Sequence, residues 1–310
     1  MPTVNYLADK LNLIGNSIDC TELTTNKFEM RERLKKSGLP IPKYQLVQKK
    51  SDVNFDVLSF PLIVKPIDRS GSRGILKVSS IDELKSGIIK ATDVSFTDKI
   101  LIEEFIEGDE YSIESLSQDG IHEILQITEK FTTGSPNFIE HAHLSPARIN
   151  EKLKSRISKI VKESLDSLNV YNGASHSEIK ISNNNEIKII EIAARMGGDF
   201  IGSDMVEIST GFDYVESVIR VALGQNIEYI TLKNKENAIV KFIFDKEDVK
   251  KLKEVERKYP ELIKEMHINQ KVERVNDSSS RNGYCILKIT DNDKLSNVLE
   301  ILDMHKKNKE

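Results

Sequence analysis

The chain has 310 residues, of which 38% are hydrophobic and 30% charged, and its formal net charge is −4. This length is enough for two or three compact units with cores of their own, and the composition is typical of a folded globular protein. A small negative charge provides no concentrated basic surface, so nucleic acid is not an expected partner.

The sequence also gives no sign of a membrane or secreted protein. No apolar stretch approaches the roughly eighteen residues that a membrane span needs, and the N-terminus lacks a secretory signal pattern. Cys20 and Cys285 are too far apart in the sequence to indicate a disulfide framework or a paired-cysteine metal site. We therefore expect a cytoplasmic enzyme or binding protein with no membrane partner.

The first third of the chain predicts helices alternating with short strands. Residues 4–17 indicate one short amphipathic helix and a turn. A second helix is expected from Thr24, because threonine and asparagine cap candidates stand at its start and Gly38 and Pro40 follow its end. Short strands are expected at residues 43–47, 61–66, 74–80 and 101–106, and a helix over residues 81–91 that Ser79 or Ser80 would cap.

The rest of the chain predicts antiparallel sheet followed by a Lys/Glu-rich unit. Strands at residues 111–117 and 122–130 flank a turn, and a helix spans roughly Asn150 to Leu168. A hairpin with its turn at Ser182–Asn185 comes next. A further helix and a βαββα-like terminal unit are then expected at residues 212–224, 238–245, 246–260, 271–275, 283–290 and 291–307.

Two glutamates on the predicted hairpin are the strongest functional signal. Glu178 and Glu191 each end or interrupt an alternating apolar run, and they would project from one face of neighbouring strands. Carboxylates that close repel each other unless a cation lies between them. Mg²⁺ prefers hard oxygen ligands and shares its coordination shell with phosphate. The hairpin therefore predicts a magnesium–nucleotide site.

Residues earlier in the chain could hold a triphosphate at that site. Lys65 ends a strand, and the backbone N–H groups of the loop after it can turn toward phosphate oxygens. This loop is not a P-loop, since no GxxxxGK[ST] motif is present, and a plain hairpin turn ending in a surface lysine is the alternative. Lys27, near a helix N-terminus, could reach the same phosphates or only aid solubility. The loop consists of Arg69, Ser70, Gly71, Ser72, Arg73 and Gly74.

An edge-like strand could hold the nucleoside. Its backbone groups would face an adenine, and Glu110, after the turn, could bind ribose hydroxyls. The alternative is a strand and turn whose acidic residues face solvent. The strand residues concerned are Glu103, Glu104, Phe105 and Ile106.

One arginine and three histidines complete the candidates. The guanidinium of Arg195 could bind a carboxylate or phosphate in bidentate fashion, or pair with the nearby glutamates when no ligand is bound. His141 and His143 form an HxH pair that could place two imidazoles on one strand face, but no third soft ligand for zinc follows. His143 and His176 could equally contact substrate or be structural.

Taken in order, these motifs resemble the ATP-grasp superfamily over about Thr21 to Gly224. In that superfamily two α+β lobes clamp ATP, and most members activate a carboxylate as an acylphosphate that an amine or other nucleophile attacks. The resemblance implies phosphate contacts by Lys27 and Lys65, a closing loop at Arg69–Gly74, adenine binding by Glu103–Ile106, ribose binding by Glu110, and magnesium on Glu178 and Glu191.

Three segments look most like the branch of L-amino-acid (dipeptide) ligases: the sequence EIAAR and residues 127–147 and 277–290. The chain is also similar to the ATP-grasp parts of carbamoyl-phosphate synthase and phosphoribosylglycinamide synthetase. Ala193 stands where many members have an asparagine metal ligand, so the resemblance implies one Mg²⁺, or Mn²⁺ in its place, rather than two.

The resemblance implies four parts: a remnant of a Rossmann-like domain (1–20), a small lobe (21–98), a large lobe with the metal site (99–225) and a C-terminal α/β subdomain (226–310). The expected reaction joins a small-molecule carboxylate to an amine, with Arg195, His143 and His176 as catalytic residues. A carbamoyl-phosphate-synthase-like or phosphoribosylglycinamide-synthetase-like activity, or a catalytically silent ATP-binding protein, is the alternative. The short N-terminus suggests a homodimer or a partner that supplies the missing domain.

Overall fold

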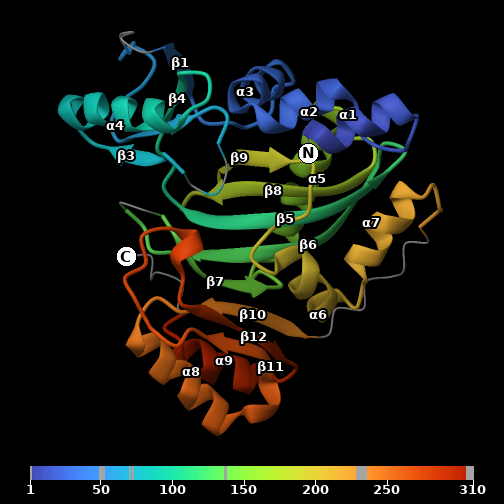
Figure 1. The fold of residues 1–310 in the computed structure, drawn as a ribbon, viewed down its shortest axis with the longest axis vertical. Helices are drawn as coiled ribbons and strands as arrows, with labels where there is room; N and C mark the ends of the chain where they lie inside the picture. Colours follow the sequence, from blue (N-terminus) through green and yellow to red (C-terminus); the bar gives the residue numbers. More distant parts are fainter. Residues whose placement is uncertain are drawn as a thin grey trace.

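The structure is a computed structural model that describes residues 2–48, 53–69, 71, 73–135, 138–227 and 236–304. Within these residues, the chain forms a four-stranded and an eight-stranded antiparallel sheet. Figure 1 shows the small sheet and the N-terminal helices at one end of the molecule, with the C-terminal helices at the other. The class is α+β, as the sequence predicted. Among the described residues, no helix has both the length and the apolar character needed to cross a membrane.

Three helices open the chain: α1 (Pro2–Leu11), α2 (Ile18–Thr25) and α3 (Lys27–Lys36). Ser17 caps α2 through its hydroxyl, and the Asn26 side chain accepts the N–H groups of Phe28 and Glu29 at the start of α3. The helix expected from Thr24 is therefore the junction of two helices, because Asn26 ends one and caps the next. This junction places Lys27 in the first turn of α3, where its side chain is buried.

The small sheet has the strand order β1 (Tyr44–Gln48), β4 (Lys99–Glu104), β2 (Leu62–Pro66), β3 (Leu76–Val78). Helix α4 (Ile81–Val94), capped by Ser80, packs on it. The small lobe was expected to end at residue 98. Strand β4 nevertheless lies between β1 and β2, and its Ile100 and Ile102 complete the core of this sheet, which therefore extends to Glu104.

The large sheet forms the body of the molecule, and helix α5 (Glu151–Ser167) covers its main core. Ile157, Val161 and Leu165, one apolar stripe of α5, pack against the strands that carry the predicted hairpin. The strand order is β11 (Ile263–Ile268), β12 (Gly283–Ile289), β10 (Asn237–Phe242), β7 (Glu140–Ser145), β6 (Ile121–Thr132), β5 (Asp109–Gln118), β8 (Gly173–Ile181), β9 (Ile187–Ala193).

The C-terminal unit has the predicted order of strand, helix, two strands and helix, with α8 (Lys246–Lys258) and α9 (Asn292–Ile301) on one side. The strand predicted at residues 271–275 is wrong. Those residues form a loop, because the side chain of Asn282 bonds the backbone of Glu273 at both its N–H and its carbonyl. The edge position next to β12 is taken by β11. Since β10 pairs with β7, this unit extends the large sheet.

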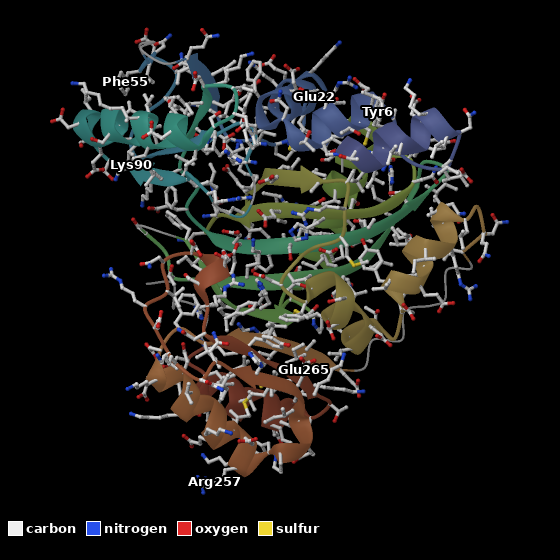
Figure 2. The ribbon with its side chains drawn as sticks, in the orientation of Figure 1. Tyr6, Glu22, Phe55, Lys90, Arg257 and Glu265 are labelled. Atoms are coloured by element: carbon white, nitrogen blue, oxygen red, sulfur yellow. The ribbon has the colours of Figure 1, made fainter. Side chains whose placement is uncertain are left out.

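Between β9 and the helix expected at residues 212–224 lies a segment that the sequence did not predict. Two consecutive non-glycine residues, Asp199 and Phe200, have φ angles of 54° and 64°. A π-helical turn (η1, Ile201–Met205) comes next and continues into α6 (Val206–Thr210) and α7 (Tyr214–Ala222). Figure 2 shows Phe55 and Lys90 near the small sheet at one end of the molecule and Arg257, on α8, at the other.

Candidate functional site

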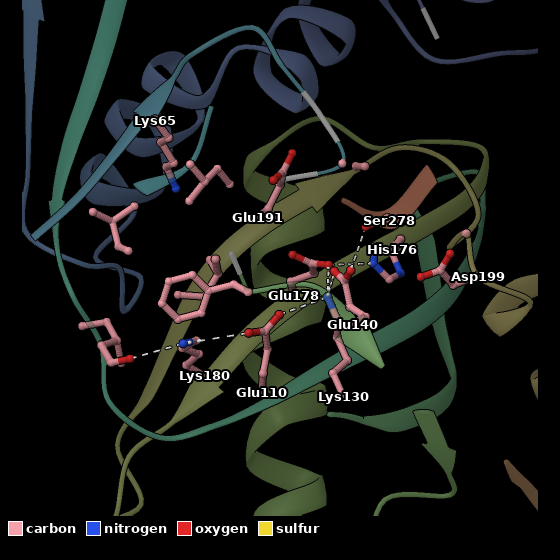
Figure 3. Close-up of a pocket in the computed structure, with 18 of the residues that line it drawn as sticks. Lys65, Glu110, Lys130, Glu140, His176, Glu178, Lys180, Glu191, Asp199 and Ser278 are labelled. Atoms are coloured by element: carbon pink, nitrogen blue, oxygen red, sulfur yellow. Dashed lines mark hydrogen bonds and ion pairs between the residues drawn. The ribbon is translucent and has the colours of Figure 1, made fainter. Parts of the chain in front are cut away.

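A cavity between the two sheets brings most of the predicted residues together. Strands β2 and β4 of the small sheet form one wall, and β5 to β9 with the segment after β9 form the other. Figure 3 shows Lys65 pointing into this space from the small-sheet side, opposite a group of carboxylates on the large sheet. The predicted residues that line it are Lys65, Gly71, Glu103, Glu104, Phe105, Ile106, Glu110, His143, His176, Glu178, Glu191 and Arg195.

The two glutamates face each other directly across the β8–β9 hairpin. Glu178 and Glu191 are register partners, and directly opposed residues of an antiparallel pair point to the same side. Each carboxylate forms an ion pair with a lysine: Lys130 Nζ lies 2.5 Å from Glu178, and Lys27 Nζ lies 3.0 Å from Glu191. The repulsion expected between the two carboxylates is thus balanced by protein cations. Burial alone would raise the pKa of Glu178, but Lys130 and His176 hold that pKa well below its usual range.

Lys130 on β6 is the main site residue that the sequence did not reveal. Its buried ammonium lies 3.0 Å from Glu110 and 3.5 Å from Glu140, in addition to Glu178. Burial lowers the pKa of Lys130, but the three carboxylates raise it well above its ordinary value. The three carboxylates lie on β5, β7 and β8, which come together only in the folded sheet. The sequence around Lys130 shows only the alternating pattern of a strand and does not indicate these partners.

The side chain of Glu103 has a role that the sequence did not predict. Its carboxylate is buried between the guanidinium of Arg31, at 2.5 Å, and Lys65 Nζ, at 2.5 Å. Burial alone would raise the pKa of Glu103, but these two cations lower it, so the carboxylate is ionised. Arg31 also donates to the carbonyl of Ile190 on β9, at 2.6 Å. The group therefore fixes Lys65 at the cavity wall and ties the small sheet to the large one.

An aromatic pocket lies at the end of the cavity where β4 leaves the small sheet. The rings of Phe105 and Phe138 have centroids 6.0 Å apart, and Lys180 donates to the carbonyl of Ile106 at 3.4 Å. Lys180 Nζ also lies 3.9 Å from Glu110. The next turn needs glycine at position 108, because a Cβ there would lie 2.1 Å from the carbonyl oxygen of Ile181. Flat apolar rings beside backbone carbonyls suit a planar base.

The predicted phosphate loop is only partly on the cavity. Gly71 lines it, and Lys27 Nζ donates to the carbonyl of Arg69 at 2.5 Å. The side chain of Arg69 instead stacks on the ring of Phe96, 3.5 Å from its centroid, so it does not enter the cavity as expected. Arg73 and Gly74 are not among the lining residues, and Ser70 and Ser72 lie outside the described residues.

The histidines have separate surroundings. Although burial lowers the pKa of His176, the Glu114 carboxylate at Nδ1 and Glu178, 3.4 Å from Nε2, raise it to about 9. Glu114 also accepts the N–H of Gly197 at 2.9 Å. His143 lines the cavity, but the predicted HxH pair is split, because a bulge in β7 at residue 141 interrupts the alternation between the two imidazoles.

The C-terminal unit contributes to the cavity as well. Arg281 pairs with Asp199 at 2.8 Å and with Glu140 at 3.2 Å, and Ser278 lines the wall. Arg195 is exposed at this end, and its guanidinium donates to the carbonyl of its neighbour Met196 at 2.7 Å. The ion pair of Arg195 with Glu178 or Glu191, the alternative expected without ligand, is absent from the described residues.

A profile of the ATP-grasp domain matches residues 58–204. Over these residues the chain is similar to ATP-grasp domains. The alanine–anticapsin ligase of Bacillus subtilis (strain 168) is 27% identical over 214 residues, which cover 61% of this chain and 45% of that enzyme. The chain thus spans about half the length of the curated relatives it matches.

Solved structures show the same ATP-grasp fold. The L-amino acid ligase of Bacillus licheniformis superposes with a TM-score of 0.83 at 24% identity, covering 98% of this chain and 76% of the other. The ADP complex of an N5-carboxyaminoimidazole ribonucleotide synthetase superposes with a TM-score of 0.72 at 19% identity, covering 98% and 78%. At these identities the likeness establishes the fold alone.

The ATP-grasp hairpin fits one magnesium ion. Glu178 is ionised, and it faces Glu191 at the cavity wall, so two hard oxygen donors converge. No three His, Cys, Asp or Glu side chains among the described residues form a ready-made metal cluster. Ala193, next in alternation after Glu191, adds no donor. Mg²⁺ commonly uses one or two carboxylates and completes its shell with phosphates and water.

Proposed function

We propose that this chain is an ATP- and magnesium-dependent ligase that joins a carboxylate to an amine through an acylphosphate. The observation that supports it most is the in-register pair Glu178–Glu191 on the wall of a cavity that both sheets enclose. The names of the relatives favour amino acids as substrates, since the alignments include an alanine–anticapsin ligase and the fold neighbours an L-amino acid ligase.

The cavity offers each part of the nucleotide a different surface. We assign the base to the pocket of Phe105 and Phe138, and the ribose to Glu110 beside it. The phosphates would then run toward Lys65 and Lys27, with Gly71 at the same wall. Lys130 and Lys27 pair with the two glutamates. Their positive charges therefore lie where the phosphates and Mg²⁺ would bind.

The reaction would proceed in two displacements. A carboxylate oxygen of the substrate attacks the γ-phosphorus, the bond to the β–γ bridging oxygen breaks, and ADP leaves. The amine nitrogen then attacks the acyl carbon, its C–O bond to phosphate breaks, the nitrogen loses a proton, and phosphate leaves. Magnesium bound at Glu178 and Glu191 would neutralise charge on the triphosphate.

The side chains mainly position and neutralise the reactants in these steps. Lys65 is held in place by Glu103, so little reorganisation is needed when phosphate charge develops beside it. Arg195 is exposed at the cavity wall without an ion pair among the described residues, which leaves its guanidinium available for the substrate carboxylate or the acylphosphate. Each such contact is typically worth about 3–4 kcal/mol of barrier when removed.

Replacing one magnesium ligand tests this function directly. We expect Glu191→Gln to lower the rate of acyl-hydroxamate formation from ATP, amino acid and hydroxylamine by roughly 10²–10³-fold, with an unchanged circular dichroism spectrum. Glu186→Gln is the matched control, because Glu186 is exposed in the turn of the same hairpin. Unchanged turnover in the Glu191 variant, with every amino acid that the parent protein accepts, would exclude the assignment.

A catalytically silent ATP-binding protein is the second candidate. It is favoured by Ala193, which offers no metal ligand, and by the lysines that already pair with both glutamates. Mg-ATP would raise the melting temperature in either case. Only the ligase would also give a hydroxamate, so the two measurements together separate the candidates.

A further inference from the structure

The backbone beside Arg195 adopts conformations that its own sequence does not favour. Asp199 and Phe200 are both in the left-handed region, with φ of 54° and 64°, which is unfavourable for residues that carry a side chain. The π-helical turn Ile201–Met205 follows at once, and such turns occur frequently at functional sites. Something outside the segment must therefore hold it.

The C-terminal unit holds both residues. The Arg281 guanidinium bonds the two carboxylate oxygens of Asp199 at 2.8 and 2.9 Å, and it also reaches Glu140 at 3.2 Å. Its carbon lies 3.8 Å from the centroid of the Phe242 ring. The ring of Phe200 packs on Tyr284 with centroids 4.4 Å apart. A two-pronged, stacked guanidinium fixes its partner more rigidly than an ammonium can.

The side chain of Arg281 is buried. It is only 7% exposed, against 33% for that of Asp199. Although burial alone would raise the pKa of Asp199, His143 and Arg281 keep it below its ordinary value, so the pair is ionic. Within the loop of residues 195–200, the N–H of Gly197 donates to the carboxylate of Glu114. A Cβ at Gly197 would lie 2.4 Å from a Glu114 oxygen, which leaves this loop little freedom there.

We infer that Arg281 is a positioning residue: it fixes the loop of residues 195–200, and through the loop Arg195, so that the C-terminal unit completes the subsite for the carboxylate substrate. This rests on the proposed function, because Arg195 would bind the carboxylate of that reaction. The proposed nucleotide surfaces lie outside the loop of residues 195–200, on α3, β2, β4, β5 and the loops at Gly71 and Phe138. Loss of Arg281 should therefore affect the carboxylate and leave the nucleotide unaffected.

The chain offers a matched control. Lys264 on β11 pairs with Asp204 in the π-helical turn at 2.7 Å, which also links the C-terminal unit to this segment. Asp204 is not among the residues lining the cavity. Lys264→Met thus removes an ion pair to the same segment without releasing Asp199. A purely structural role for such links would make the Lys264 and Arg281 variants alike.

The test compares Arg281→Met, Arg281→Lys and Lys264→Met in the whole chain. For Arg281→Met we expect amide hydrogen exchange in residues 195–206 to rise about tenfold or more. We expect kcat/KM for the carboxylate in the hydroxamate assay to fall about 10- to 100-fold, with the Kd for Mg-ATP within about twofold of the parent value. For Arg281→Lys we expect an exchange rate and a kcat/KM between those of Arg281→Met and the parent protein, since lysine keeps the positive charge but lacks the forked guanidinium. Lys264→Met should match the parent protein.

Three results would overturn the inference: unchanged exchange in residues 195–206, an equal loss of ATP affinity, or the same effect from Lys264→Met. If Arg281→Met does not fold, Asp199→Asn takes its place, because it removes the same ion pair and keeps the side-chain shape. A parent protein that makes no hydroxamate would refute the proposed function, and the exchange measurement would then decide alone whether Arg281 fixes the loop.

Discussion

Single residues in this site are held by networks of buried charge. Lys130 is the clearest case, since its side chain is 4% exposed and it contacts Glu110, Glu140 and Glu178. A buried ion pair contributes little net stability compared with apolar residues, but removal of one partner leaves uncompensated charge. Here three carboxylates depend on one ammonium.

We expect Lys130→Met to lower the free energy of unfolding by about 3–5 kcal/mol. Methionine fills a similar volume, so the loss would reflect the uncompensated carboxylates rather than a cavity. Urea unfolding at neutral pH without nucleotide measures it. Lys159→Met is the control, because Lys159 is 76% exposed on α5, and surface changes usually stay within about 0.5 kcal/mol. A loss below about 1 kcal/mol at Lys130 would mean that water screens this cluster.

Several residues of the site could be identified from the sequence because their signals are local. Glu178 and Glu191 share a short hairpin, so alternation alone put them on one face. The partners that define their charge state, Lys130 and Lys27, lie 48 and 164 residues away along the chain. The side chain of Glu103 pairs with both Arg31 and Lys65. The sequence did not predict this contact, because Arg31 lies on a helix far from Glu103 along the chain.

Among the elements, those with local start and stop signals were predicted well. Asn26, Ser80 and Asn150 cap helices as their side-chain chemistry favours. The elements that the sequence missed depend on distant partners. β11 is a strand because β12 pairs with it, and the π-helical turn Ile201–Met205 forms where the C-terminal unit holds the residues before it.

Strand β7 joins the two halves of the large sheet and carries His141, a histidine whose pKa is lowered in the folded protein. Burial, and then the nearby Lys241 ammonium, lower the pKa of His141 to about 4. The unfolded chain, with an ordinary histidine pKa near 6.5, therefore binds more protons than the folded chain between about pH 6.5 and 4. The stability that neutral His141 contributes is complete above pH 6.5 and is lost as the pH falls toward 4.

We expect His141→Gln to reduce the loss of stability on acidification. A single proton can contribute at most about 1.4 kcal/mol per pH unit, so the slopes of unfolding free energy against pH should differ by less than this between pH 6 and 4.5. Urea unfolding of both proteins at half-unit intervals measures the difference. Above pH 7 the difference between the two proteins should no longer change with pH. Equal slopes between pH 6 and 4.5 would show that His141 becomes protonated in the folded protein without cost.

For the whole molecule, the arrangement of two sheets with a cavity between them makes ligand binding an interaction between lobes. Arg31 links the two sheets, because it pairs with Glu103 on β4 and donates to the carbonyl of Ile190 on β9. The carbonyl of Arg69 is held by Lys27, which also pairs with Glu191 on the large sheet. A triphosphate that binds Lys27, Lys65 and Gly71 would add contacts on both sides of the loop.

We therefore expect Mg-ATP to slow tryptic cleavage after Arg69 and Arg73, because proteases cut segments that open locally and the nucleotide would bind only the closed form. If cleavage needs that opening, a concentration 100 times Kd can slow it by up to about 100-fold. Cleavage after Arg257, exposed on α8 at the far end of the molecule, is the internal control (Figure 2). Equal slowing at Arg257 would indicate general stabilisation, and no slowing at Arg69 and Arg73 would mean that this loop does not close over phosphate.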